Sequence, residues 1–133
     1  MAIRVAINGF GRIGRLMFRR AYELGTDDIE IVAINNLSDN KQLSHLLQYD
    51  SSYGTFKADV EPIGDDIIRV DDKKIQYSQE RDPAKVPWGK AKVDIVLEST
   101  GVFTKIEDAS LHLHDGVKKV IFTAVCKGGK KII

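Results

Sequence analysis

Three glycines near the start of the chain have the spacing of a phosphate-binding turn. Gly9, Gly11 and Gly14 form the pattern G-x-G-x-x-G directly after an apolar segment, residues 3–8. In this pattern the first glycine permits a sharp turn, the second lets the backbone approach a pyrophosphate, and the third lets a helix pack closely on a strand. The unpaired N–H groups at the start of that helix favour an anion. The chemistry predicted here is the binding of a dinucleotide.

The segments on either side of the glycines support this interpretation. The glycine pattern alone is weak, because it also occurs in turns that bind nothing. Here residues 3–8 have the character of a buried strand, and residues 29–34 form a second such segment that ends in a polar pair. Between them, apolar residues recur at helical spacing at Ile13, Leu16, Met17, Ala21 and Leu24. This order predicts two parallel strands joined by a right-handed crossover.

Asn36 follows the second predicted strand, where an acidic residue usually binds the adenosine ribose. A carboxamide can accept one hydrogen bond and donate another, but it has no charge to repel a 2′-phosphate. We therefore expect weaker discrimination against NADP. NAD remains favoured, because no arginine lies nearby in the sequence and Leu37 offers only an apolar wall. The alternative is that Asn36 merely caps or turns the chain.

The rest of the chain alternates strands and helices, with one exception. A helix that carries Leu43, Leu46 and Leu47 is predicted next. Its candidate N-cap residues are Ser38, Asp39 and Asn40. Residues 56–79 change to short strands broken by acidic turns, which indicates a small antiparallel insertion. Strands are predicted again over residues 93–98 and 117–123. The predicted fold class is α/β, a Rossmann-type doubly wound parallel sheet with that small insertion.

Composition limits the class of protein. The chain has 133 residues, 43% of them hydrophobic and 29% charged, with a formal net charge of +1. These values indicate one soluble globular domain and give no electrostatic sign of a nucleic-acid or membrane partner. One cysteine suits a reducing compartment. The first residues pass straight into the predicted strand, which leaves no room for a signal peptide, so we expect a cytoplasmic location.

The late lysines and the three histidines are interpreted as structural residues. A late lysine cluster could contact a phosphate backbone, but a solvated surface is the preferred interpretation because no aromatic residues are interleaved with it. Its members are Lys118, Lys119, Lys127, Lys130 and Lys131. His45 has no partner at ligand spacing, and His112 and His114 have no cysteine or carboxylate constellation beside them. We therefore predict no metal site.

Five segments together resemble the amino-terminal, cofactor-binding domain of the phosphorylating (type I) glyceraldehyde-3-phosphate dehydrogenases. They occur in that family's order and span nearly the whole chain, at residues 8–15, 32–37, 49–51, 80–83 and 98–103. The resemblance implies NAD as cofactor. It also implies that the complete enzyme oxidises and phosphorylates D-glyceraldehyde 3-phosphate to 1,3-bisphosphoglycerate in glycolysis, with inorganic phosphate as co-substrate, and that it is a homotetramer.

The resemblance also implies roles for individual residues. Those that would cradle the pyrophosphate are Asn8, Gly9, Phe10, Gly11, Arg12 and Ile13. Asn36 and Leu37 would meet the adenosine ribose, and Arg81 would approach the adenine. The predicted turn after residue 98 would lie toward the nicotinamide through Ser99, Thr100, Gly101 and Phe103. Thr123 stands where the family usually has serine, and its hydroxyl could make the same contact.

The sequence departs from the family pattern in three places. Asn36 replaces the usual aspartate, and Val125-Cys126 replaces a proline and a small residue. The family's Ser-Cys-Thr-Thr-Asn segment and its partner histidine do not occur within residues 1–133. Cys126 has no activating histidine or helix start in its sequence context, so we interpret it as an ordinary thiol. We therefore expect a dinucleotide-binding domain truncated at its C-terminal end, without the catalytic domain and inactive alone.

Two other interpretations remain at this stage. The first is a freestanding, non-catalytic module that binds a dinucleotide. The second is an interaction fragment with a vestigial ligand site, which the three intact glycines disfavour.

Overall fold

The computed structural model describes most of the chain. The described residues are 3–25, 28–50, 54–82, 85–99, 112–114 and 116–122. The strands are β1 (Ile3–Asn8), β2 (Ile29–Asn35), β3 (Tyr49–Asp50), β4 (Gly54–Thr55), β5 (Val60–Ile63), β6 (Ile67–Val70), β7 (Lys73–Ser78), β8 (Ile95–Glu98) and β9 (Lys119–Phe122). The helices are α1 (Arg12–Leu24), α2 (Asn40–Gln48) and the 3-10 helix η2 (Trp88–Ala91).

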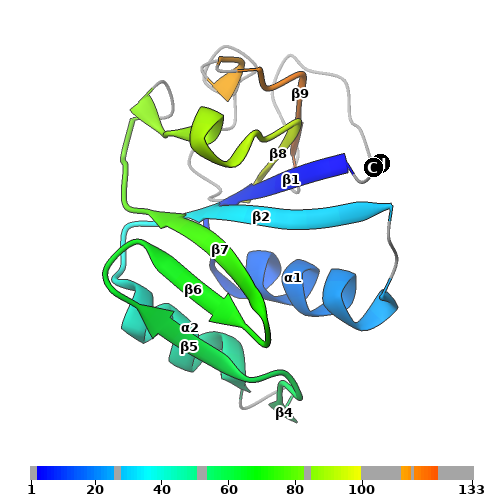
Figure 1. Ribbon diagram of the computed structural model, residues 1–133, viewed down its shortest axis with the longest axis vertical. Helices are drawn as coiled ribbons and strands as arrows, with labels where there is room; N and C mark the ends of the chain where they lie inside the picture. Colours follow the sequence, from blue (N-terminus) through cyan, green and yellow to red (C-terminus); the bar gives the residue numbers. More distant parts are fainter. Residues whose placement is uncertain are drawn as a thin grey trace.

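Seven strands form one sheet in the order β5-β6-β7-β2-β1-β8-β9 (Figure 1). β1 pairs in parallel with β2 and β8, and β9 pairs in parallel with β8. The predicted antiparallel insertion is present, since β6 pairs antiparallel with both β5 and β7. β7 then pairs in parallel with β2, so the insertion extends the main sheet instead of standing apart from it. The predicted α/β Rossmann-type class is confirmed.

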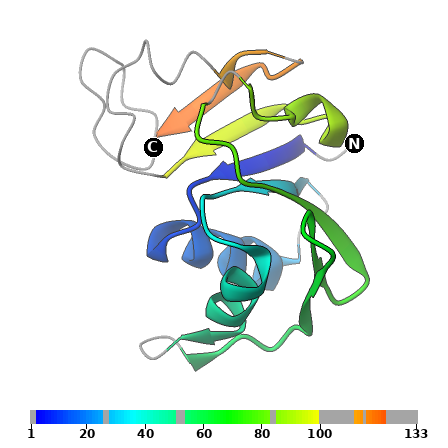
Figure 2. The ribbon, with the colours of Figure 1, turned by 90° about the vertical axis from the view of Figure 1, so that its left-hand side faces the viewer.

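The two faces of the sheet are covered differently. Both α1 and α2 lie on one face (Figure 2) and bury an aromatic and aliphatic core with residues such as Phe18, Leu43 and Tyr77. The segment around η2 covers the other face, where Trp88 packs among small residues and valines such as Val96. Alternate residues of a strand point to opposite faces, so β1 contributes Ile7 to the first core and Ala6 to the second. The buried residues described in β6 and β7 all belong to the first core.

Local sequence explains where the helices begin and end. α1 ends at Gly25, whose φ of 60° is left-handed and whose N–H donates to the carbonyl of Tyr22, as the glycine stop predicts. α2 begins after Asp39, whose side chain accepts from the N–H of Gln42. Within α1 the fully covered aromatic residue is Phe18, whereas Ile13 and Leu24 at its ends are exposed.

No helix in the described part of the chain has the length and apolar character required to cross a membrane.

Candidate dinucleotide site

A cleft of about 440 Å³ opens at the carboxyl ends of the parallel strands. Its walls come from the segments that follow β1, β2, β7 and β8. The lining residues are Asn8, Gly9, Gly11, Asn35, Asn36, Leu37, Ser38, Glu80, Arg81 and Ser99. Ligands of open α/β sheets bind at this edge of the sheet, where connections leave in opposite directions.

The glycine turn after β1 is compact because two of its residues must lack a side chain. Gly9 has a φ of 93°, which an L side chain rarely adopts. A Cβ on Gly14 would lie 2.5 Å from the Gly9 carbonyl oxygen, inside the contact distance of the backbone. A Cβ on Gly11 would have no atom within 4 Å, so the turn is open toward the cleft at that residue. α1 starts at the next residue without a side-chain cap, and this leaves its first N–H groups for a ligand.

Ser99, after β8, holds the turn from the other side. Its N–H donates to the Asn8 carbonyl (2.9 Å), and its hydroxyl donates to the Gly9 carbonyl (2.5 Å). The same hydroxyl oxygen lies 3.2 Å from the Asn8 carbonyl. These bonds fix the ends of β1 and β8 against each other at the floor of the cleft.

Asn36 is tied to the glycine turn by its side chain. Its Oδ1 accepts from the backbone N–H of Phe10 at 3.0 Å, and its own N–H donates to the Ser78 carbonyl at 3.0 Å. The hydroxyl of Tyr77 donates to the carbonyls of Ser38 and Asn36. Burial, followed by the charge of Asp39, raises the pKa of Tyr77 above its ordinary value, so this hydroxyl remains a neutral donor. Asn36 therefore shapes the turn and also lines the cleft.

A pair of buried asparagines forms the floor between β1 and β2. Asn35 Nδ2 donates to Asn8 Oδ1 at 2.7 Å, and the Asn35 carbonyl accepts from the N–H of Gly9 at 2.8 Å. Asn35 Oδ1 accepts from the N–H of Glu80 (2.9 Å) and from the hydroxyl of Ser78 (2.7 Å). Both amides are buried, so these bonds satisfy groups that would otherwise lose water without replacement.

The structure brings together seven of the residues singled out from the sequence. Asn8, Gly9, Gly11, Asn36, Leu37, Arg81 and Ser99 all line the cleft. Phe10 is fully buried beneath it and offers only its backbone, and Ile13 is exposed on the first turn of α1, outside the lining set. Thr100, Gly101, Phe103, Thr123 and the side chain of Arg12 lie outside the described residues.

Sequence reasoning missed Asn35, Ser38 and Glu80 as lining residues. An asparagine at the end of an otherwise apolar strand was the available signal for Asn35. The sequence shows no constellation of cysteines or carboxylates beside His112, and the fold brings one carboxylate to it, since its Nε2 lies 2.9 Å from Glu98 Oε1. The two residues are fourteen positions apart in the chain, so no local spacing indicated this contact. Among the described residues, no group of three or more His, Cys, Asp or Glu could hold a metal ion.

The fold and the cleft define a dinucleotide-binding domain of the Rossmann type. The family model described as "Glyceraldehyde 3-phosphate dehydrogenase, NAD binding domain" matches residues 3–106. The chain belongs to this family, which confirms the resemblance and NAD as the family's cofactor.

Named relatives agree with the family assignment. The chain is 56% identical over 125 residues to glyceraldehyde-3-phosphate dehydrogenase of Thermotoga maritima, covering 94% of this chain and 37% of the relative. It is 54% identical over 124 residues to glyceraldehyde-3-phosphate dehydrogenase 1 of Bacillus subtilis, covering 93% and 36%. It is 48% identical over 127 residues to the chloroplastic glyceraldehyde-3-phosphate dehydrogenase A of Zea mays, covering 95% and 32%. The chain thus spans about a third of the length of these relatives.

Proposed function

We propose that the cleft at the carboxyl ends of β1, β2, β7 and β8 binds NAD across the sheet. The pyrophosphate lies over the Gly9–Gly11 turn and the first N–H groups of α1. The adenosine half lies toward Asn36, Leu37 and Arg81, and the nicotinamide half toward the segment after β8. The observation that carries the proposal is the glycine turn, where backbone fills the space at Gly14 and open space faces the cleft at Gly11.

The proposed site retains the residues expected from the sequence. Asn8 and Ser99 shape the turn, and Phe10 contributes its backbone N–H to hold Asn36. Arg12, Ile13, Thr100, Gly101, Phe103 and Thr123 complete the proposed cofactor set from the family resemblance. Bound NAD would supply a hydride acceptor at its nicotinamide ring, while the residues of this chain bind and orient it.

We also propose that the cleft accepts NADP. Asn36 lines the cleft, and its Oδ1 accepts from the Phe10 N–H, so its amide nitrogen, a donor, is the atom proposed to meet the cofactor. A donor can bind a ribose oxygen or a 2′-phosphate oxygen, whereas the usual carboxylate would repel the phosphate. NAD remains the preferred cofactor, since Arg81 is the single basic residue among the described residues that line the cleft.

The longer protein implied by the relatives is proposed to be a phosphorylating, NAD-dependent aldehyde dehydrogenase. Its substrates would be D-glyceraldehyde 3-phosphate and inorganic phosphate, and its assembly a cytoplasmic homotetramer. Residues 1–133 are proposed to form the cofactor domain and to be inactive alone, because no family catalytic Ser-Cys-Thr-Thr-Asn segment occurs within them. A freestanding binding module is the alternative. Reading the gene past the codon for Ile133 separates the two.

Substitution of Gly11 by alanine tests the site. The added methyl meets open space at a φ of −75°, so the melting temperature should stay the same or rise slightly. The Kd for NAD should rise at least about tenfold, because the methyl occupies the space in which the pyrophosphate approaches the backbone. Isothermal titration calorimetry measures this effect.

Leu24→Ala is the control, since Leu24 is exposed at the far end of α1 and should leave the Kd unchanged. A wild-type chain that does not bind NAD, or a Gly11→Ala variant with wild-type affinity, would refute the proposed site.

Asn36→Asp tests the NADP proposal. The carboxylate can still accept from the Phe10 N–H, and NADP affinity should fall about tenfold or more while NAD affinity is kept. Equal effects on both cofactors would contradict it.

A further inference from the structure

A network of hydrogen-bonded, buried polar side chains runs beneath the cleft from η2 to the segment after β7. Trp88 Nε1 lies 3.1 Å from His112 Nδ1, and His112 Nε2 lies 2.9 Å from Glu98 Oε1. Asn8 Nδ2 lies 2.7 Å from the same Glu98 oxygen, and Asn8 Oδ1 continues to Asn35. All five side chains belong to residues that are at most 3% exposed, so solvent does not replace these bonds.

The donor and acceptor of each hydrogen bond in this network follow from the groups at the two ends of the network. An indole N–H can only donate, so His112 Nδ1 accepts from Trp88 and the imidazole carries its proton on Nε2. His112 Nε2 therefore donates to Glu98. At the other end, a backbone N–H can only donate, so Asn35 Oδ1 accepts from Glu80 and Asn35 Nδ2 donates to Asn8 Oδ1.

The two series of donors converge on one oxygen. Asn8 Nδ2 and His112 Nε2 are 3.2 Å apart, and both direct their hydrogens to Glu98 Oε1. The acceptor at residue 98 thus serves both donors. With that acceptor in place, the reversed orientation of the Asn8 amide would put its oxygen against the Glu98 oxygen, so a single orientation remains.

The orientation of these amides matters at the surface of the cleft. The Asn8 amide bonds to that of Asn35, which in turn bonds to the N–H and carbonyl of Glu80 and to the hydroxyl of Ser78. Asn8, Asn35 and Glu80 line the cleft from three different segments, and Glu80 directly precedes Arg81. Asn8 and Asn35, at one end of this network, therefore hold the turn after β1, the turn after β2 and the segment after β7 in position relative to one another.

We propose that Glu98 and His112 are positioning residues for the dinucleotide. They hold Asn8, and through it Asn35 and the Glu80 segment, in the arrangement that binds the cofactor, without contacting the cofactor themselves. This inference rests on the proposed function of the cleft.

Two substitutions of Glu98 with similar volume separate the acceptor from packing. Glu98→Gln keeps an oxygen for Asn8 and His112, and its Kd for NAD should stay within about twofold of wild type. Glu98→Leu removes the acceptor that Asn8 and His112 share, and its Kd should rise about tenfold. Calorimetry is run at a temperature where circular dichroism shows each variant fully folded.

His112→Phe provides a second variant in case Glu98→Leu does not fold. It keeps a ring but removes the bonds to Trp88 and Glu98, and it should also raise the Kd several-fold. His45→Phe, an exposed histidine on α2, is the matched control and should bind as wild type. A merely structural role would lower the melting temperature and leave the Kd of the folded variants unchanged, and that result would overturn the proposal.

A spectroscopic readout tests the mechanism directly. The chain has one tryptophan and four asparagines, Asn8, Asn35, Asn36 and Asn40, so ¹⁵N labelling of these residue types gives few signals. Glu98→Leu should shift the side-chain amides of Asn8 and Asn35 and leave that of Asn40 in place. Unchanged Asn8 and Asn35 signals in a folded variant would refute the inference, and a wild-type chain that does not bind NAD would refute the proposed function as well.

Discussion

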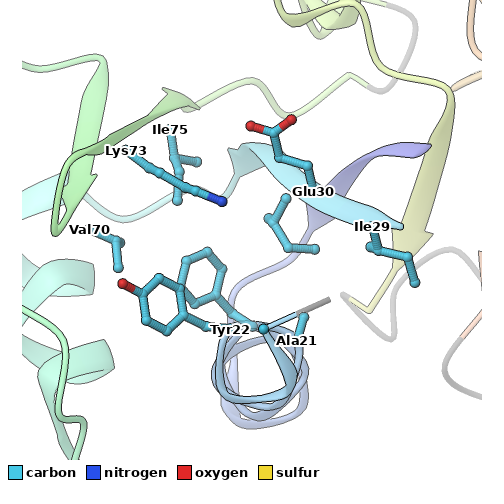
Figure 3. Close-up of a pocket in the computed structure, with 10 residues that line it drawn as sticks. Ala21, Tyr22, Ile29, Glu30, Val70, Lys73 and Ile75 are labelled. Carbon is cyan, nitrogen blue, oxygen red and sulfur yellow. The ribbon is translucent and has the colours of Figure 1, made fainter. Parts of the chain in front are cut away.

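The two ends of the sheet both contain a hollow, and the hollows differ in chemistry more than in size. The cleft at the carboxyl end has a volume of about 440 Å³, and a groove at the amino end has about 320 Å³. The groove lies between α1 and strands β2, β6 and β7 (Figure 3), and its walls are mainly side chains such as Phe18, Tyr22, Val70 and Ile75. The cleft is lined by glycine backbone, three asparagines and two serines, together with the charged Glu80 and Arg81 and the apolar Leu37.

This difference follows from the direction of the parallel strands. Helix α1 begins at the carboxyl end and ends at the amino end, so its free N–H groups and the positive end of its dipole face the cleft. Its last carbonyls are at the groove, next to Gly25. An anionic pyrophosphate is therefore favoured at one end only. The convergence of donors, and not the volume of a hollow, is therefore the reason for proposing the cleft as the dinucleotide site.

Phe18→Ala should have the largest effect and should act at the groove end. Phe18 is almost fully buried, and its ring contacts those of Phe10, Tyr22 and Phe56. Its truncation should reduce the free energy of unfolding by about 3–5 kcal/mol, because a cavity remains in the core. Urea denaturation measures this loss. At a temperature where the variant is folded, its Kd for NAD should be close to wild type. A loss of NAD affinity as large as that of the cleft variants would show that the two ends of the sheet are not independent.

Gly14→Ala should have the next largest effect and should act at the cleft end. The new Cβ would lie 2.5 Å from the Gly9 carbonyl oxygen and 3.2 Å from Ser99 Oγ, so the turn or α1 must shift. We expect the Kd for NAD to rise at least about a hundredfold, equal to about 2.8 kcal/mol. Calorimetry on the folded fraction checks this, with Gly11→Ala as the comparison that adds a methyl without a clash. Wild-type affinity in Gly14→Ala would show that close packing at this turn is not required.

The features that the sequence predicted are those set by neighbouring residues. The turn at Gly9–Gly14, the end of α1 at Gly25 and the cap at Asp39 depend on backbone conformation within a few residues. The parallel pairing of β7 with β2 and the contact between Glu98 and His112 depend on residues brought together by the sheet. No periodicity in one segment contains that information.

The exposure of side chains along α1 likewise could not be predicted from the sequence of that segment alone. Apolar spacing correctly predicted a helix but did not show that Ile13 and Leu24 would be exposed at its two ends, one beside the cleft and one near the groove. The segments packed against a helix decide which of its turns are covered, and here the middle of α1 carries the buried Phe18. The candidate cleft was predictable at its glycine turn and at Asn36, while Ser38 and Glu80 enter it only through the fold.

The smallest predicted effect concerns pH and is confined to the groove end. The Tyr22 hydroxyl donates to Asp71, and this bond, with burial and the charges of Asp71 and Asp72, raises the pKa of Tyr22 to about 12 from 10.0. Unfolded tyrosine releases its proton near the lower value, so the neutral hydroxyl stabilises the fold fully below pH 10 and loses this contribution as the pH rises through 12. Tyr22→Phe should reduce the free energy of unfolding at pH 8 by about 0.5–1.5 kcal/mol.

The difference between wild type and Tyr22→Phe should shrink between pH 10 and pH 12, which urea denaturation at each pH measures. Tyr77, whose pKa is also raised, is present in both proteins and cancels from this difference. Because Tyr22 lies in the groove and is not among the residues that line the cleft, the Kd for NAD at pH 8 should be the same in both proteins. A difference in stability that does not depend on pH would mean that the hydroxyl acts by packing alone. A changed Kd for NAD would mean that α1 transmits the loss of the Tyr22 hydrogen bond from the groove to the cleft.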